Sequence, residues 1–375
     1  MAKRTNWQIG RDQDYPYDAA PPQRQVAYVF DTNKCIECQT CTVACKTCWT
    51  SGKGQEHIFW NNVETKPYGG YPQRWDLSIL RKSGTAHWQG STLRTQTIFE
   101  GNEPLDPPLG WRPEVLDYAA PNQGEDDVAG QITRGHHITG IHPQWMFYLA
   151  RICNHCDNPA CLAACPRKAI YKRDEDGIVL IDQERCRGYQ ECVKACPYKK
   201  TFYNLISRAS EKCIGCYPRV EQGLTALCVE GCIGKIRLHG LRTTQAAPRE
   251  DHPIDYLVRI RKLALPLYPQ FGTGPNVFYV PPVHVPDGYL DQLFGPGVAE
   301  AKALYRTLKD DKKLLGALLL FGATDKMIDR FEVKGDTVVG WDAKGAEVCT
   351  VPFTEAHVVR PAFDERHGAY RHNTP

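Results

Sequence analysis

The stretch Cys153–Pro197, CNHCDNPACLAACPRKAIYKRDEDGIVLIDQERCRGYQECVKACP, contains seven cysteines in two closely spaced sets. Each set ends in a cysteine that is followed by proline. The residues between the sets predict two short strands, 169–173 and 178–181, joined by a turn at Asp176-Gly177, a pair that favours the positive φ angles of a hairpin. This hairpin is expected to bring the end of the first set back to the start of the second.

The spacing of these cysteines is typical of iron–sulfur proteins. It resembles the bacterial two-cluster ferredoxin run C-x2-C-x2-C-x3-C-P, in which the fourth cysteine binds the other cluster. The set that begins at Cys153 departs from that run, because two extra residues separate Cys156 from Cys161. Close spacing lets one turn present several thiolates to a compact inorganic core, and the proline then ends the loop.

The second of these sets lacks one cysteine. Counting three residues on from Cys186, where a ligand is expected, gives Tyr189 in place of a thiol. A phenol is a poor replacement for a thiolate. We therefore expect this site to hold three irons, as a [3Fe–4S] cluster.

Two further sets flank the central stretch. One follows a predicted buried strand, Gln25–Asp31, with the strict spacing C-x2-C-x2-C-x3-C, and the other has the spacing C-x2-C-x11-C-x3-C. The ferredoxin unit is therefore expected twice, with the outer sets forming one pair and the inner sets the other. The outer sets are Cys35, Cys38, Cys41 and Cys45, and Cys213, Cys216, Cys228 and Cys232.

The fourth-cysteine rule predicts which thiolates share a cluster, provided that each pair of sets folds as a ferredoxin does. Cys165, Cys186 and Cys192 are expected to hold the [3Fe–4S] cluster, with Tyr189 at the missing corner; we call this the three-iron site. Three [4Fe–4S] sites complete the prediction: Cys35, Cys38, Cys41 and Cys232 (site one), Cys45, Cys213, Cys216 and Cys228 (site two), and Cys153, Cys156, Cys161 and Cys196 (site three).

The composition narrows the class of protein. Of the 17 cysteines, all but Cys48 and Cys349 fall into these sets, so metal binding is favoured over a disulfide framework. Those two residues are expected to be ordinary thiols. The 46 basic and 43 acidic residues leave a net charge of only +3, which argues against nucleic acid as a partner.

Two other classes of protein compete with an iron–sulfur electron carrier. Zinc also binds C-x2-C pairs, so a zinc-binding scaffold with four-thiolate sites is one alternative. All four sets end in C-x3-C, however, and two continue into proline, which zinc does not require. An autonomous dehydrogenase would need a flavin or nicotinamide motif, and none is visible in the sequence. No catalytic residues are therefore predicted.

The expected fold class is α+β, with two ferredoxin-like double-cluster modules in a pseudo-twofold arrangement, long insertions and a C-terminal extension. Helices are expected at 255–265 and 298–322, extended chain at Pro266–Pro286, and a small hairpin from Phe331.

The predicted segments are 1–24, an N-terminal arm along a partner or partly disordered; 25–49 plus 205–245, module one; 50–145, a cysteine-free insertion that covers the clusters or contacts a subunit; 146–204, module two; and 246–375, the extension.

No transmembrane segment is expected. The N-terminus has basic residues but no apolar core, so it is not a conventional secretory signal. No apolar run approaches the roughly 18 residues of a transmembrane helix. The longest apolar run of the C-terminal part, Leu314–Phe321, suits either a membrane or partner contact or a buried helix segment, and the buried helix is favoured.

The sequence resembles the iron–sulfur β subunits of the DMSO reductase family of molybdenum enzymes. The resemblance covers residues 25 to about 285 and rests on the order of the four sets, the aromatic residue in the third, and the segments NKCIECQTCTVACK, WNNVETKPYGGYP, RICNHCDNPACLAACPRKAIYKR and EKCIGCYPRVEQG. It lies with the branch of nitrate reductase, nitrite oxidoreductase, ethylbenzene dehydrogenase and the selenate, chlorate and perchlorate reductases. The segments NWQIGRDQDYPYD and WNNVETKPYGGYPQ look most like nitrite oxidoreductase and its close nitrate reductase relatives.

This resemblance implies a non-catalytic electron-transfer subunit of an oxidoreductase complex, with three [4Fe–4S] clusters and one [3Fe–4S] cluster. Site one would face a catalytic α subunit with a molybdenum bis-pterin site, and the three-iron site would face a haem-b γ subunit, a cytochrome or another electron carrier. The implied chemistry is nitrite oxidation or nitrate reduction; the alternative is the same role with ethylbenzene, selenate, chlorate or perchlorate. The complex is expected to be membrane-associated, either periplasmic by co-export with a signal-bearing partner or on the cytoplasmic face.

Overall fold

The computed structural model mixes short helices with small β-sheets, which confirms the expected combination of helix and sheet. The second half of the predicted insertion, beyond residue 100, lies outside the described residues. The structure describes residues 2–17, 20–67, 70–72, 75–100, 145–244, 246–354, 362–364 and 369–371.

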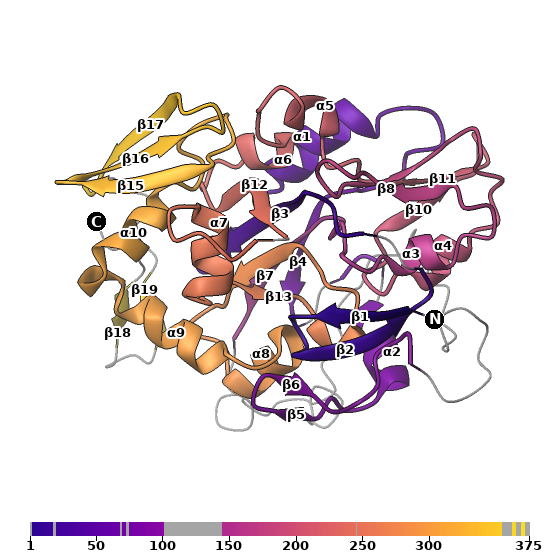
Figure 1. Ribbon diagram of the computed structural model, residues 1–375, viewed down its shortest axis with the longest axis horizontal. Helices are drawn as coiled ribbons and strands as arrows, with labels where there is room; N and C mark the ends of the chain where they lie inside the picture. The colour runs from indigo at the N-terminus through magenta and orange to yellow at the C-terminus, as the bar shows by residue number, and fades with distance from the viewer. Residues whose placement is uncertain are drawn as a thin grey trace, which may run out of the picture.

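A four-stranded sheet with the order β12–β3–β14–β13 lies at the centre of the molecule (Figure 1). The predicted strand near residue 25 is confirmed as β3, Arg24–Asp31, and all its residues after Arg24 are buried. It pairs antiparallel with β12, Arg237–Thr243, and parallel with β14, Val277–Val280. The edge strand β13 is Leu265–Pro266. Segments from the beginning of the chain and from beyond the last cysteine set therefore build one core.

Each cysteine set includes a short helix. These helices are α1 (Thr40–Trp49), α3 (Ala160–Ala163), α4 (Glu191–Ala195) and α6 (Leu227–Glu230). Helix α1 contacts α6, and α3 contacts α4; Figure 1 shows the first pair along the upper edge of the molecule and the second at the right. A Cβ added to Gly231 would lie 3.1 Å from the Cβ of Ala44, so α1 and the end of α6 approach closely.

Two hairpins lie beside the inner sets. The predicted hairpin is confirmed as β8 (Ile170–Lys172) and β9 (Val179–Ile181), with Gly177 at φ 65° in its turn. A second hairpin, β10 (Thr201–Asn204) and β11 (Ala209–Lys212), links the third set to the fourth and was not predicted. The short helix α5, Tyr217–Val220, follows that link.

The described part of the insertion contributes a strand that leads into the central stretch. Strand β4, Asn62–Lys66, pairs antiparallel with β7, Phe147–Arg151, which ends two residues before Cys153. The other elements of this part are α2 (Trp75–Ser83) and the small hairpin β5 (Trp88–Gln89) and β6 (Thr92–Leu93).

The N-terminal segment forms a hairpin that packs on the same chain, although the sequence suggested an arm along a partner or partial disorder. Strands β1 (Ala2–Asn6) and β2 (Arg11–Tyr15) pair antiparallel. The side chain of Asn6 donates a hydrogen bond to the carbonyl of Gly272 at 3.1 Å, and Gln8 donates one to Pro275 at 2.8 Å. The hairpin is thereby fixed to the loop that precedes β14.

The C-terminal region differs in part from its prediction. The helical segment expected at 255–265 is shorter, because α7 (Pro253–Asp255) passes into one π-helical turn, Tyr256–Ile260, and strand β13 follows. The segment expected to be extended contains a 3-10 turn, Pro269–Phe271, and the buried strand β14.

The helix expected at 298–322 is divided into two. Helix α9 (Val298–Arg306) is followed by a 3-10 turn, Leu308–Asp310, and by α10 (Lys312–Leu319), whose N-cap Asp311 accepts a hydrogen bond from Leu314 N at 2.9 Å. The apolar run in α10 is buried, as expected.

The remaining C-terminal elements that the structure describes are a helix, a three-stranded sheet and a pair of short strands. Helix α8 is Asp287–Phe294. The predicted hairpin is confirmed as β15 (Arg330–Lys334) and β16 (Thr337–Trp341), to which β17 (Glu347–Pro352) adds a third strand; β18 (Ala362–Asp364) pairs with β19 (Ala369–Arg371). No helix among the described residues is long and apolar enough to cross a membrane.

Candidate iron–sulfur sites

The cysteines predicted for site three line one cavity. Cys153 and Cys156 come from the turn after β7, Cys161 lies on α3, and Cys196 lies at the end of α4. Besides these four thiols, the cavity is lined by residues that include His155, Tyr198, Lys200 and Lys212. Two positively charged side chains therefore accompany four sulfurs.

A second cavity is lined by the cysteines predicted for site one. Cys35 and Cys38 come from the loop after β3, Cys41 lies on α1, and Cys232 follows α6. Arg237, at the start of β12, lines the same cavity. Residues almost two hundred positions apart thus meet, which the contact between α1 and α6 makes possible.

The cysteines of the two remaining sites are also close neighbours. Burial raises the pKa of Cys45, and the nearby thiols of Cys213, Cys228 and Cys216 raise it further. Burial likewise raises the pKa of Cys192 to about 12. The nearby thiols of Cys165 and Cys186 also raise this pKa, and a hydrogen bond with the Ser210 side chain lowers it. Cys45 of one outer set therefore lies close to cysteines of the other outer set, and Cys165 lies close to Cys192 across the inner pair.

All four sets begin with the same backbone turn. The second residue after the first cysteine has a positive φ in each set: 56° at Glu37, 41° at His155, 69° at Gly188 and 63° at Gly215. Positive φ is uncommon outside glycine, so its recurrence at Glu37 and His155 marks a required turn. The repeated turn folds each loop back on itself around its thiols.

Tyr189 occupies the same position in its loop as Cys38. Each follows a positive-φ residue and precedes a glutamine in the left-handed region, at φ 58° for Gln39 and 62° for Gln190, and a helix begins directly after each glutamine. Cys38 is exposed, and Tyr189 is 60% exposed. The phenol of Tyr189 therefore occupies the loop position that Cys38 occupies in the set that begins at Cys35.

A closing turn recurs after three of the four sets. The third residue after the last cysteine is a lysine with positive φ, 50° at Lys168, 50° at Lys199 and 47° at Lys235, and its N–H donates to the carbonyl of that cysteine. In two of these turns the next N–H donates to the cysteine sulfur, at 3.3 Å for Cys165 and 3.4 Å for Cys196. The repeated sequence C-x2-K, in CPRK, CPYK and CIGK, is a signal that our reading of the sequence missed.

The donor set suits iron–sulfur clusters. Burial raises the pKa of Cys35 and Cys216 to about 11 and that of Cys228 to about 12, so their thiolates need compensating positive charge, which bound iron supplies. Further backbone N–H groups already donate to sulfur, from Ser210 to Cys186 at 3.3 Å and from Gly215 to Cys213 at 3.4 Å.

The arrangement is less suited to zinc. Four thiolates on one zinc ion would each lie about 2.3 Å from a common point. Among the residues with described positions, no three His, Cys, Asp or Glu side chains converge in that way. The sulfurs of sites one and three instead surround cavities, as expected when each thiolate binds a different iron of a cluster.

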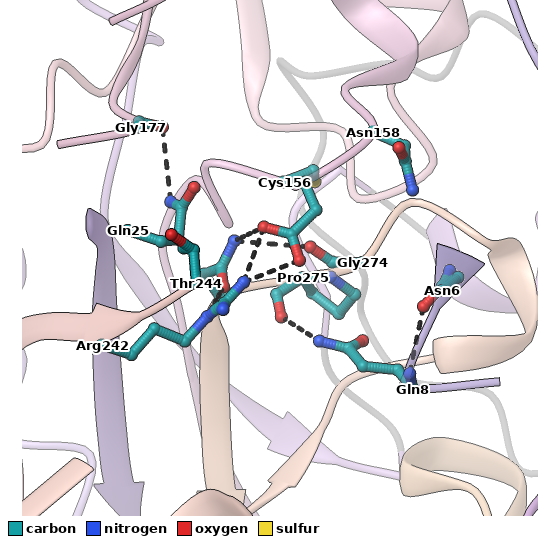
Figure 2. A network of polar contacts seen from close by, with 12 residues as sticks. Asn6, Gln8, Gln25, Cys156, Asn158, Gly177, Arg242, Thr244, Gly274 and Pro275 are labelled. Carbon is teal, nitrogen blue, oxygen red and sulfur yellow. Dashed lines mark hydrogen bonds and ion pairs between the residues drawn. The ribbon is translucent and has the colours of Figure 1, made fainter. Parts of the chain in front are cut away.

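A polar network beside Cys156 holds the site-three loop against the central sheet. Figure 2 shows Arg242 of β12 reaching toward this loop, where both carboxylate oxygens of Asp157 accept hydrogen bonds from its Nη2 at 2.8 and 2.7 Å. Arg242 Nε also donates to Asn276 Oδ1 at 2.8 Å, and the amides of Asn276 and Gln25 each donate to the carbonyl of His155 at 3.1 Å. Burial raises the pKa of Asp157, but Arg242 and Lys172 bring it below its usual value.

The sequence did not identify the charged side chains around the thiols. Arg237, Lys200 and Lys212 lie outside the cysteine sets, and no spacing rule relates them to a cluster; their positions depend on the fold. The two cysteines outside the sets differ in environment. Cys48 is exposed on α1, whereas burial raises the pKa of Cys349 in β17 to about 11.

Comparison with known proteins agrees with this chemistry. Residues 144–242 match the family model of the 4Fe-4S dicluster domain. Over 314 residues the chain is 45% identical to selenate reductase subunit beta of Thauera selenatis, covering 75% of this chain and 90% of that protein. It is 47% identical over 313 residues to chlorate reductase subunit beta of Ideonella dechloratans, with the same coverages, and 42% identical over 315 residues to respiratory nitrate reductase subunit beta of Haloferax mediterranei, covering 74% and 84%.

These relatives share most of their length with the chain, and the three cysteine sets between Cys153 and Cys232 lie within the residues that match the 4Fe-4S dicluster domain. The chain therefore belongs to the iron–sulfur beta subunits of the DMSO reductase family of molybdenum enzymes, the non-catalytic electron-transfer subunits of these oxidoreductase complexes.

Proposed function

We propose that this subunit carries electrons along three [4Fe–4S] clusters and one [3Fe–4S] cluster, between a molybdenum bis-pterin catalytic subunit and a haem-b subunit or another electron carrier. The observation that carries the proposal is that the cysteines predicted for sites one and three line two cavities, with four thiols around each. The ligand sets of the proposal are those predicted as sites one, two and three and the three-iron site.

The arrangement of the helices supports two modules in a pseudo-twofold relation. In a two-cluster ferredoxin each set donates its last cysteine to the cluster of the other set, so the two sets must be neighbours. Helix α1 contacts α6 and α3 contacts α4, which pairs the outer sets and the inner sets. The opening turn recurs in all four sets and the lysine turn in three, which further supports a repeated unit.

Exposed apolar side chains flank both ends of the proposed cluster chain. Ile36 and Ile233, each 66% exposed, directly follow the site-one cysteines Cys35 and Cys232. Leu205 and Ile206, 76% and 67% exposed, lie in the turn of the β10–β11 hairpin. In the second strand of that hairpin, Ser210 N donates a hydrogen bond to the sulfur of Cys186, a three-iron-site cysteine. Exposed apolar groups favour contact with partner subunits, in keeping with the molybdenum subunit at site one and the electron carrier at the three-iron end.

The reaction we propose for the complex is nitrite–nitrate interconversion, which the segment WNNVETKPYGGYP and the nitrate reductase relatives favour. A second candidate is chlorate or selenate reduction, because the identities with those beta subunits are 47% and 45%. We propose that the complex is membrane-associated, in keeping with its respiratory nitrate reductase relatives. Of the two sides of the membrane we propose the periplasmic one, reached by co-export with a signal-bearing partner.

The cluster proposal is tested by iron and acid-labile sulfide analysis of the complex purified without oxygen. The expected result is iron and sulfide in the amounts of three [4Fe–4S] clusters and one [3Fe–4S] cluster, together with a co-purifying molybdenum subunit. Zinc without sulfide, or a beta subunit recovered from native extract as a monodisperse monomer, would refute it.

The substrate is tested by activity of the same complex with nitrite, nitrate, chlorate, selenate and ethylbenzene. Turnover of nitrite or nitrate is expected. Inactivity with both nitrogen oxides, alongside turnover of chlorate or selenate, would reject the first candidate in favour of the second.

A further inference from the structure

Arg237 is a buried cation beside the thiols of site one. It lies at the start of β12, is 1% exposed, and lines the cavity formed by the site-one cysteines. Its Nη2 donates a hydrogen bond to Cys41 Sγ at 2.9 Å. The guanidinium is therefore in direct contact with one proposed ligand.

Arg237 also lies close to site two. Helix α6, which contains the site-two cysteine Cys228, contacts β12, the strand that Arg237 begins. An arginine side chain stays protonated in proteins, so this charge is permanent. One fixed positive charge thus lies within electrostatic reach of two proposed clusters.

Part of the guanidinium has no acceptor within the part of the chain that the structure describes. Nε and Nη1 of Arg237 have no hydrogen-bond partner among the described residues, and its Cζ lies 4.4 Å from the centre of the Phe30 ring. A buried charge is costly unless it is paired and hydrogen-bonded. The sulfur atoms of a cluster accept hydrogen bonds of this kind, and such bonds shift cluster potentials.

The cations that line the site-three cavity are two lysines, Lys200 and Lys212, whereas an arginine lines the site-one cavity. A buried lysine shifts its pKa readily, whereas arginine stays charged. Arginine at position 237 therefore provides sites one and two with a constant charge.

We propose that Arg237 raises the midpoint potentials of the clusters at sites one and two, and so sets the driving force at the end of the chain nearest the molybdenum subunit. The inference rests on the ligand sets of the proposed function. Reduction adds negative charge to a cluster, and a fixed cation in a buried, weakly screened position stabilises that reduced state.

The test compares Arg237→Gln, which removes the charge, with Arg237→Lys, which keeps a cation. A control, Arg330→Gln, removes an arginine from β15, whose contacts are with Glu332 and Trp341 and not with any cysteine of the sets. Each complex is assayed for iron and sulfide, and the paramagnetic signals of its clusters are then followed across a range of poised potentials.

In Arg237→Gln we expect two [4Fe–4S] signals to show at least a tenfold lower ratio of reduced to oxidised cluster at a given potential, which is about 59 mV for a one-electron couple. The [3Fe–4S] signal should keep its wild-type potential. Arg237→Lys should stay near the wild type, and Arg330→Gln should match it.

Three results would overturn the inference while leaving the proposed function in place. The first is unchanged midpoint potentials in Arg237→Gln with full iron content, and the second is an equal shift of the potentials in Arg237→Gln and Arg237→Lys. The third is loss of iron in Arg237→Gln alone, because Arg237 would then be required for cluster retention. A wild-type complex without iron and sulfide would refute the proposed function itself, and the inference with it.

Discussion

At the scale of single residues, Tyr189 decides which type of cluster its loop can hold. The backbone around it repeats that around Cys38, so a cysteine at position 189 would fit the loop without rearrangement. In Tyr189→Cys we expect the narrow signal of the oxidised [3Fe–4S] cluster, near the free-electron g value, to disappear. A [4Fe–4S] cluster of lower potential should replace it and slow electron flow to the acceptor.

The matched control for this change is Tyr189→Phe. It removes the phenol oxygen without supplying a thiolate, so the [3Fe–4S] signal should persist. Paramagnetic resonance of the oxidised complexes measures both variants. A wild-type complex without that signal, or a Tyr189→Cys variant that retains it in full, would show that Tyr189 does not stand at the missing corner.

At the scale of elements, a buried ionic network joins β4 of the insertion to β7, which leads into site three. Glu64 accepts hydrogen bonds from Arg151 Nε at 2.6 Å, Trp75 Nε1 at 3.0 Å and Tyr71 N at 2.9 Å. Arg151 in turn donates to the carbonyl of Tyr198 at 2.8 Å, two residues after a site-three cysteine. The network therefore connects three segments around that site.

Glu64→Gln should destabilise the fold by about 3–5 kcal/mol, because it leaves the buried Arg151 without its counter-charge, whereas Lys66 keeps its ion pair with Asp76. Burial raises the pKa of Glu64, but Arg151, Lys66 and the hydrogen bonds bring it to about 2, from 4.5. A lowered carboxylate pKa contributes stability above the unfolded value, and this contribution is lost as the pH falls from about 4.5 through about 2.

The cost of Glu64→Gln should consequently be the same at pH 7 and pH 5.5. Thermal unfolding of the complex at both pH values measures it, with the exposed Glu332→Gln in β15 as the control, for which little change is expected. A loss of stability that is absent at pH 7, or that fades by pH 5.5, would contradict the role given to Glu64.

Elements made by neighbouring residues could be predicted, and elements that depend on distant partners could not. The hairpin around Gly177 and the one from Phe331 follow from local turn residues and alternating strands. Strand β14 lies in a proline-rich segment, and its pairing with β3 and β13 makes it a strand. The polar hairpin β1–β2 offered no apolar alternation, so its burial against the loop at Gly272 was not readable from sequence.

At the scale of the whole molecule, the cluster sites are part of the hydrophobic core. Cys41, Cys216 and Cys228 pack in the same hydrophobic core as Tyr28 and Phe30 of β3. The spacing within each cysteine set is a local property that can be read from the sequence, whereas the placement of Arg237 beside the thiols depends on the packing of β12 on β3.

Removal of iron should therefore loosen the central sheet as well as the cysteine loops. Treating the complex with a chelator and an oxidant is expected to lower its melting temperature and to increase amide hydrogen exchange in β3 and β12. A chelator alone, which would extract an exposed zinc ion, serves as the control and should change little. Undiminished protection of β3 after complete loss of iron would show that the core does not depend on the clusters.

The pairing of the first cysteine set with the fourth has a consequence for synthesis of the protein. Under the proposed ligand sets, site three is complete once Cys196 has left the ribosome, whereas Cys35, Cys38 and Cys41 wait for Cys232. At 5–20 residues per second this wait is roughly 10–40 s. During that time three thiols of the nascent chain have no final partner. Insertion of the inner clusters is therefore expected to precede that of the outer ones, and the earliest thiols must be shielded from oxidation until the chain is nearly finished.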